Sequence, residues 1–446
     1  MVLPSDDQER GSLVYGHKLS SVGPGRASGS DLVHNLGSLD LAMKLHYLRG
    51  VYFLSSQAIE GLTNMKIKET MFYWLNEYFH TCGRFRRSDS GRPFVKCNDC
   101  GARFIEARCD KTIGEWLEME NWPSLQKLLA SQQVIGPELS FSPPILFQET
   151  HFRCGGISLG LSWAHVLGDA FSAADFMNRW AQVVGHIQSN GPPKITTLPL
   201  SPNTEQEENL VETPTTMLNK EVPLSLNRVD PVGDHWVTTN NLKMETFSFP
   251  ISPSQIANLK VKVVGPFFES LCALIWQSVA KLRQESEPKT VTICKHNAKR
   301  TKGVITNSQV ISTAKADFSI MEADPKKLAT LLADQATNER TEIEEAIERD
   351  QGVSDFIVYG ANLTFVDWQE VNFYGLELQG YKPDFVTYSI QGIGDNGAVL
   401  VLPGSNHFGK GGEKGRLVTM ILPENEIFRL KSELKKIGLL LESSIE

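Results

Sequence analysis

Large and small side chains alternate over residues 157–163, where Ile, Leu, Leu and Trp are separated by Ser, Gly and Ser. Because successive side chains of a strand point to opposite faces, this period of two predicts a strand with one bulky and one nearly bare face. Ser172 to Asp175 then has the spacing of a helix-capping box. Apolar residues recur after it at helical spacing: Phe176, Trp180, Val183 and Val184. The region therefore predicts a strand, a short turn and a helix.

Helical and extended patterns also alternate along the rest of the chain. Apolar stripes of helical period predict helices at 66–79, 112–129, 266–282 and 325–350, and near the C-terminus from 427 to 441. Short apolar or alternating runs predict strands at 94–107, 247–251, 291–294, 361–366, 384–390 and 398–402. Such a mixture predicts an α/β fold class.

Length and composition divide the chain into two predicted domains. With 446 residues, the chain is longer than one ordinary domain. Residues 188–234 are rich in Pro, Asn, Thr, Ser and Glu without apolar periodicity, which predicts a crossover linker. We therefore expect one domain over 36–187 and a second over 235–446, preceded by a partly mobile N-terminal arm over 1–35.

The overall composition is typical of a soluble globular protein, with 41% hydrophobic and 22% charged residues. A formal net charge of -8 argues against nucleic acid as a partner, because phosphate binding needs a basic face. The start of the chain lacks the features of a secretory signal, and no run of about 18 apolar residues occurs. We expect a protein of the cytoplasm, or one attached peripherally to the cytosolic side of a membrane.

Seven cysteines, scattered along the chain, fit reduced thiols better than a disulfide framework. Cys97 and Cys100 have the spacing of half a zinc site, but the chain has no second such pair, and only Cys109 lies nearby. We therefore expect no metal. Asn98 and Asp99 favour a polar turn between strands instead.

His165 and Asp169 stand four residues apart where the predicted strand gives way to the helix. A neutral imidazole there can take a proton from a hydroxyl or amine that attacks a carbonyl carbon, which is general-base chemistry. The chain offers no serine at a strand-to-helix elbow and no convincing cysteine nucleophile. Direct transfer from an activated donor such as a thioester therefore fits better than a covalent acyl-enzyme. Asp169 can contact the imidazole or brace the turn through an arginine or backbone amides.

The run from Cys154 to Asp169 resembles the core signature of the plant BAHD acyltransferases. Other landmarks follow in that family's order, from the helix that ends in Cys82-Gly83-Arg84-Phe85-Arg86 to the C-terminal strand and helix. The resemblance implies two similar chloramphenicol-acetyltransferase-like domains with a channel between them. Acyl-CoA would enter from one side and the acceptor from the other, with no permanently bound cofactor. His165 would act as general base, and Asp169 would hold the turn.

The second signature of that family, Asp-Phe-Gly-Trp-Gly, is replaced by Asn372-Phe373-Tyr374-Gly375-Leu376. The motif match makes Asn372, Phe373 and Gly375 channel-lining residues. This replacement, with residues 39–47, 96–99 and 360–366, is similar to the eceriferum and glossy subgroup of the family.

Resemblance to that subgroup implies a role in elongating very-long-chain fatty acyl-CoA for cuticular wax. The chain would act as an accessory to a condensing enzyme of the fatty-acid elongase at the cytosolic face of the endoplasmic reticulum, and as a monomer apart from that partner. The alternative is an active acyl-CoA-dependent O- or N-acyltransferase with His165 as its base.

Two features stay open between a functional and a structural interpretation. Lys295, Lys299 and Arg300 form a basic patch that either pairs with the phosphates of coenzyme A or is a solvated surface. The bare face of Ser158, Gly160 and Ser162 either admits an acyl chain or packs tightly against a neighbouring segment.

Overall fold

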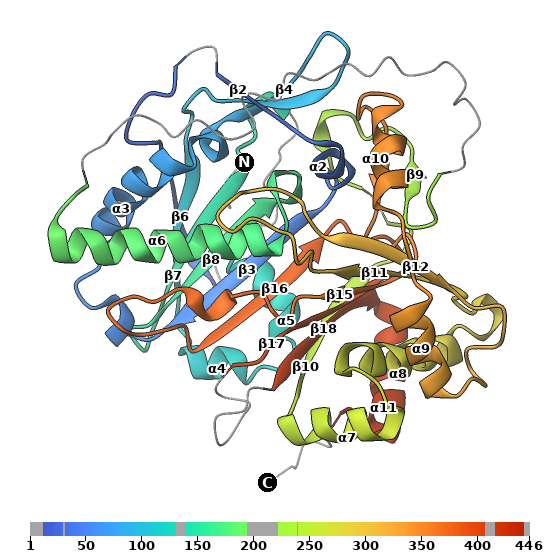
Figure 1. Ribbon diagram of the computed structural model, residues 1–446. Coiled ribbons are helices and arrows are strands. Elements are labelled where there is room, and N and C mark those ends of the chain that lie inside the picture. Colours follow the sequence, from blue (N-terminus) through green and yellow to red (C-terminus); the bar gives the residue numbers. More distant parts are fainter. Residues whose placement is uncertain are drawn as a thin grey trace.

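The computed structural model describes residues 12–29, 32–130, 139–193, 222–238, 240–405 and 415–440. Residues 1–11 and 30–31 of the predicted arm and 194–221 of the predicted linker lie outside the described residues. Two large sheets, each covered by helices, form the body of the molecule (Figure 1). This mixture of helices and strands confirms the predicted α/β class.

The first large sheet carries the strand that leads to His165. In the described residues its strand order is β1 (Tyr15–Val22), β6 (Ala102–Cys109), β7 (Ile145–Phe152), β8 (Ile157–Ala164), β3 (Tyr47–Leu54) and β16 (Phe385–Gln391). Part of the predicted arm is therefore an edge strand, because β1 pairs antiparallel with β6. A smaller sheet has the order β2 (Val33–Asn35), β5 (Pro93–Lys96) and β4 (Arg84–Arg87).

Helices α3 (Asn64–Glu77) and α6 (Ala170–Asn190) cover one face of the first sheet (Figure 1). Trp74 of α3 and Phe176 of α6 lie with ring centroids 4.1 Å apart, and both rings contact Phe147 of β7. The predicted apolar stripe of α6 thus faces the sheet. Its predicted start was wrong, because the cap of α6 is Asp169 and not Ser172.

The opposite face of this sheet packs against α4 (Ile113–Leu117), α5 (Trp122–Leu125) and the 3₁₀ helix η3 (Gln126–Leu128). Trp116 of α4 meets Phe152 edge to face, and Phe152 points away from Phe147 because the two residues are five positions apart on the same strand. The single helix predicted over 112–129 is interrupted. Pro123 stands in the first turn of α5, where its missing N–H is tolerated.

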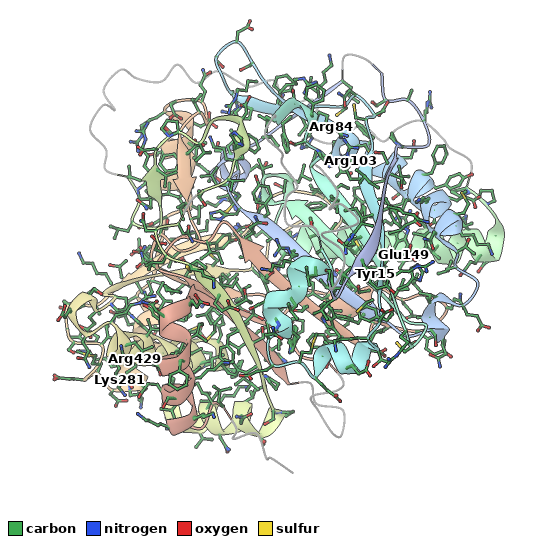
Figure 2. The ribbon with its side chains drawn as sticks, turned by 180° about the vertical axis from the view of Figure 1, so that it is seen from behind. Tyr15, Arg84, Arg103, Glu149, Lys281 and Arg429 are labelled. Carbon is green, nitrogen blue, oxygen red and sulfur yellow. The ribbon has the colours of Figure 1, made fainter. Side chains whose placement is uncertain are left out.

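The second large sheet, within the described residues, has the order β10 (Met244–Ile251), β18 (Arg416–Pro423), β17 (Ala398–Pro403), β15 (Leu363–Asp367), β11 (Thr290–Lys295), β12 (Val310–Lys315) and β13 (Thr337–Asn338). Its helices are α7 (Pro253–Val263), α8 (Phe267–Leu282), α9 (Pro325–Asp334) and α11 (Glu424–Lys436). α8 buries most of its residues in a second core. Seen from behind, Lys281 of α8 and Arg429 of α11 lie near each other on this domain (Figure 2).

In the part of the chain that the structure describes, no single helix has both the length and the apolar character needed to cross a membrane. By length and composition alone, the pair α7 and α8, bent by 78°, passes that test together.

Contacts between the two halves bring distant segments to the end of β8. Strand β16 belongs to the predicted second domain, yet it pairs antiparallel with β3 along its whole length. Helix α10 (Arg340–Glu348) packs on α2 (Ser38–Ala42), and strand β14 (Asp355–Ile357) pairs with β9 (Asn227–Val229). A buried ion pair of 2.9 Å joins Lys44 to Asp355. These contacts hold the loop that connects β11 to β12, and the residues before β15, against His165.

Candidate active site

His165 opens the 3₁₀ helix η5 (His165–Leu167) directly after β8, at the strand-to-helix turn that the sequence predicts. Its backbone N–H donates to the carbonyl oxygen of His46 at 3.0 Å. Its own carbonyl oxygen accepts a 2.7 Å bond from Asn307 Nδ2, which reaches over from the β11–β12 loop. The His165 side chain is completely buried. Both domains therefore fix the position of this histidine.

The imidazole of His165 has a direct partner in Tyr359, which no sequence pattern singled out. Tyr359 Oη lies 3.0 Å from His165 Nε2. Gln309 Nε2 donates to the same hydroxyl oxygen at 3.4 Å, so the hydroxyl proton is available to Nε2. His46 supports this arrangement, because its Nε2 accepts from the backbone N–H of Val358 at 3.0 Å. The nitrogen that a general base would use is thus engaged inside the protein.

Burial sets the protonation states at this site. It lowers the pKa of His165 to about 4, an effect partly offset by its own carbonyl oxygen, by Asp169 and by Asn307. Burial also lowers the pKa of His46 to about 3, and the neighbouring His165 adds to this. The pKa of Tyr359 is raised well above 10.0, again by burial. Near neutral pH the site therefore holds neutral imidazoles beside a neutral phenol.

Asp169 holds the turn and the domain interface, as the sequence interpretation allowed. Its Oδ1 accepts from the backbone N–H of Ser172 at 3.0 Å and so caps α6. Its Oδ2 accepts from the backbone N–H and the hydroxyl of Ser308 at 3.1 and 2.9 Å. These hydrogen bonds of the carboxylate join the start of α6 to the β11–β12 loop.

Asp40 forms a second anchor for the same loop. Its Oδ1 accepts from the backbone N–H and from Nδ2 of Asn307 at 3.0 and 2.9 Å. Burial raises the pKa of Asp40 to about 6, while the hydrogen bonds from Asn307 act in the opposite direction. Asn307 thus links Asp40 to the carbonyl oxygen of His165, a role that no local signal in the sequence reveals.

The basic patch predicted near the end of β11 is largely neutralised. Lys295 forms an ion pair with Glu269 of α8. Arg300, whose side chain is only 4% exposed, forms one of 2.9 Å with Asp175 of α6. Lys299 is exposed. Of the three residues proposed for the phosphates of coenzyme A, the structure places two in ion pairs and leaves Lys299 at the surface.

The residues of the altered second signature lie in the connection between β15 and β16, where they are tightly packed. The carbonyl oxygen of Asn372 accepts a 2.9 Å bond from Asn178 of α6. Phe373 is buried and stacks on Tyr388 of β16, with ring centroids 4.1 Å apart. A Cβ at Gly375 would lie 2.3 Å from Asn372 Nδ2 and 2.7 Å from Asn178 Nδ2. Asn372, Phe373 and Gly375 thus contact α6, β16, each other and, through Phe373, the ring of Trp368 after β15.

The face of β8 that carries only small residues is covered by a neighbouring segment at Gly160. A Cβ at Gly160 would lie 1.9 Å from the carbonyl oxygen of Leu129, so the backbone after η3 rests directly on the strand. Ser158, within the run Gly156-Ile157-Ser158-Leu159-Gly160, lies inside β8 and is buried, not at an elbow. Gly160 is therefore required for packing, which favours the structural interpretation of this face.

The turn at Cys97 and Cys100 connects β5 to β6, as the polar-turn interpretation predicts. All seven cysteines are free thiols. Arg84, labelled in Figure 2, donates to the carbonyl oxygens of Gly83 and Gly101 at 2.7 and 3.0 Å, so an arginine organises this turn. Among the described residues, no group of three or more His, Cys, Asp or Glu side chains is placed to hold a metal ion.

Comparisons with known proteins extend over nearly the whole chain. The model of the Transferase family matches residues 22–437. Protein ECERIFERUM 26-like of Arabidopsis thaliana is 43% identical over 438 residues, which cover 97% of this chain and 98% of that protein. These matches place the chain in the family whose signature it resembles.

Solved structures agree in fold. The crystal structure of vinorine synthase has a TM-score of 0.69 at 17% identity and covers 94% of this chain and 97% of its own. TRI101 of F. graminearum, complexed with coenzyme A and deoxynivalenol, has a TM-score of 0.65 at 15% identity and covers 90% and 97%. The two-domain arrangement is therefore confirmed. The chain belongs to the Transferase family of BAHD acyltransferases and, within it, to the eceriferum subgroup.

Proposed function

We propose that this protein promotes the elongation of very-long-chain fatty acyl-CoA for cuticular wax biosynthesis as an accessory to a condensing enzyme. The observation that carries the proposal is the bond between His165 Nε2 and Tyr359 Oη. A base in direct acyl transfer must meet the proton of the acceptor, whereas here the basic nitrogen is bonded within a buried site. Near full-length similarity to Protein ECERIFERUM 26-like supports the same assignment.

Acyl-CoA is the ligand that fits this role, with no permanently bound cofactor. A fold neighbour, TRI101, has been solved with coenzyme A, which supports a ligand that carries coenzyme A for the shared fold. The exposed Lys299 is the residue of the basic patch best placed for a phosphate, because Lys295 and Arg300 are paired. The condensing enzyme would place the protein at the cytosolic face of the endoplasmic reticulum.

A catalytic acyl-CoA-dependent O- or N-acyltransferase is the second candidate. The observation in its favour is the neutral imidazole of His165, whose pKa burial lowers to about 4. A neutral imidazole can accept a proton without first losing one. In this second function Tyr359 has to leave Nε2 before the acceptor can approach.

Replacing His165 separates the two candidates. In a plant line that lacks the endogenous protein, we expect His165→Ala to restore wax chain length as fully as the unmodified chain. Loss of rescue at normal protein abundance would overturn the accessory role and favour catalysis. Tyr52→Phe is a suitable control, because it also removes a buried hydrogen-bonding group in the same sheet, at a distant point of β3.

A further inference from the structure

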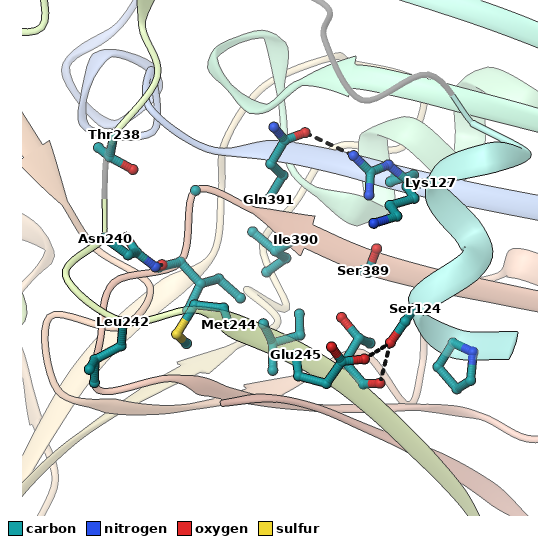
Figure 3. A pocket seen from close by; sticks show the side chains of 16 residues that line it. Ser124, Lys127, Thr238, Asn240, Leu242, Met244, Glu245, Ser389, Ile390 and Gln391 are labelled. Carbon is teal, nitrogen blue, oxygen red and sulfur yellow. Dashed lines mark hydrogen bonds between the residues drawn. The ribbon is translucent and has the colours of Figure 1, made fainter. Parts of the chain in front are cut away.

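A cavity of about 390 Å³ lies between the two domains beside α5 (Figure 3). The first domain contributes Ser124 of α5 and Lys127 of η3, and the second contributes Met244 to Thr246 of β10 and Ser389 to Gln391 of β16. This volume is within the range of about 300–1,000 Å³ of small-molecule sites.

Arg49 of β3 lines this cavity and lacks a counterion. Its guanidinium donates to Gln391 Oε1 at 2.9 Å, and its Nε is buried without a hydrogen-bond partner. In the part of the chain that the structure describes, no carboxylate lies within ion-pair distance of it. Burial lowers its pKa to about 10, so it stays charged near neutral pH. Arg49 as a whole is partly exposed toward the cavity, so its guanidinium can be reached by a ligand. A guanidinium without a counterion that lines a cavity indicates an anionic ligand.

The rest of the cavity has a polar and an apolar part. Lys127 adds a second, exposed cation. Glu245 is the carboxylate of the cavity, and it accepts from the hydroxyl of Ser124. The cations thus exceed the carboxylates by one. The apolar part is made by Leu242, Met244, Ile390, Ile393 and Ile421.

We propose that this cavity binds an organic carboxylate with an apolar tail, with the carboxylate on Arg49 and the tail along the apolar part. A guanidinium presents paired N–H donors that match the two oxygens of a carboxylate. The apolar residues beside it favour an amphipathic acid over an inorganic anion. The proposal does not depend on the use of His165, which lies outside the residues that line this cavity.

Calorimetric titration of the full chain with decanoate, decanol and inorganic phosphate tests the proposal. We expect decanoate to bind, with decanol at least about tenfold weaker, because the alcohol cannot form the charged bonds to Arg49. Phosphate is expected not to displace decanoate. Arg49→Gln should lower the affinity for decanoate by at least about tenfold. Lys243→Gln should leave this affinity unchanged, because the ammonium of Lys243 pairs with Glu424 outside the cavity.

Equal affinity for decanol and decanoate, or unchanged affinity in Arg49→Gln, would overturn the proposal. Phosphate binding that blocks decanoate would overturn it too, in favour of a phosphate site. Thermal unfolding without ligand gives a second readout, because removing an uncompensated charge should not lower the melting temperature. If Arg49→Gln fails to fold, Lys127→Glu at the exposed rim must still lower the affinity for decanoate. An unchanged affinity of the Lys127→Glu variant would count against the site.

Discussion

The hydroxyl oxygen of Tyr359 lies 3.0 Å from Nε2 of His165, and both side chains are buried. The two residues come from different halves of the chain, so this bond crosses the domain interface. This bond engages Nε2 of His165, the nitrogen that would otherwise face the acceptor substrate of an acyl transfer. His165 is therefore both a recognisable family residue and a structural contact of the interface.

Removing the Tyr359 hydroxyl should destabilise the protein through His165. We expect Tyr359→Phe to lower the free energy of unfolding by about 1–3 kcal/mol, because a buried hydrogen-bonding nitrogen loses its partner. Urea unfolding of Tyr359→Phe, His165→Ala and the double variant should show that the losses are not additive. Tyr52→Phe breaks a buried hydrogen bond to Tyr388. Its loss in the free energy of unfolding should simply add to that of His165→Ala, because the two sites are not coupled. If the losses of Tyr359→Phe and His165→Ala simply add, the bond between the two side chains contributes nothing to stability.

Acid should destabilise the fold through the buried histidines. Native His165 and His46 have pKa values lowered by burial to about 4 and about 3, whereas an unfolded histidine titrates near 6.5. Between these values the unfolded state binds more protons, so the free energy of unfolding falls as pH drops below about 6.5. Asp40, whose pKa burial raises to about 6, acts in the opposite direction as pH falls further.

Urea titrations between pH 7 and pH 4.5 would measure this effect. We expect His165→Gln to show a shallower decline in the free energy of unfolding than the unmodified chain. His235→Gln is a matched control, because His235 is exposed. Identical slopes for His165→Gln and the unmodified chain would show that His165 does not titrate differently in the two states.

Loss of the Asp169 carboxylate should lower the free energy of unfolding more than loss of an ordinary helix cap. We expect Asp169→Ala to lower the free energy of unfolding by about 2–4 kcal/mol, because it removes the cap of α6 and the two bonds from Ser308. Asp324, which caps α9 at an exposed position, is the matched control, and Asp324→Ala should cost about 1 kcal/mol. Equal losses in chemical denaturation would argue against the link to Ser308.

A methyl group at Gly160 should not be accommodated. Its Cβ would lie 1.9 Å from the carbonyl oxygen of Leu129, and a backbone atom cannot move aside as a flexible side chain can. We expect Gly160→Ala to lower the free energy of unfolding by about 1–3 kcal/mol or more. Gly185→Ala, with no atom within 4 Å of its Cβ on α6, should instead stabilise by about 0.5–1 kcal/mol. A tolerated Gly160→Ala would reopen this face of β8 to a ligand.

Local pattern determined the elements around His165. Alternation over 157–163 and the helical stripe from Phe176 correspond to β8 and α6, because side-chain period depends only on the backbone geometry of one segment. The errors were local as well. α6 begins three residues earlier because Asp169 caps it, and the helix expected over 112–129 is interrupted around Pro123.

By itself, then, the sequence determined the α/β class, the turn that bears His165 and Asp169, and the family. Only the tertiary structure decided what surrounds these residues. Tyr359 stands 194 positions from His165, and Gln391 stands 342 from Arg49. Periodicity shows which face of a segment is apolar, but the distant segment that covers this face is chosen by the packing of the whole core. Packing placed Tyr359 on Nε2 of the histidine and left Arg49 unpaired in a cavity.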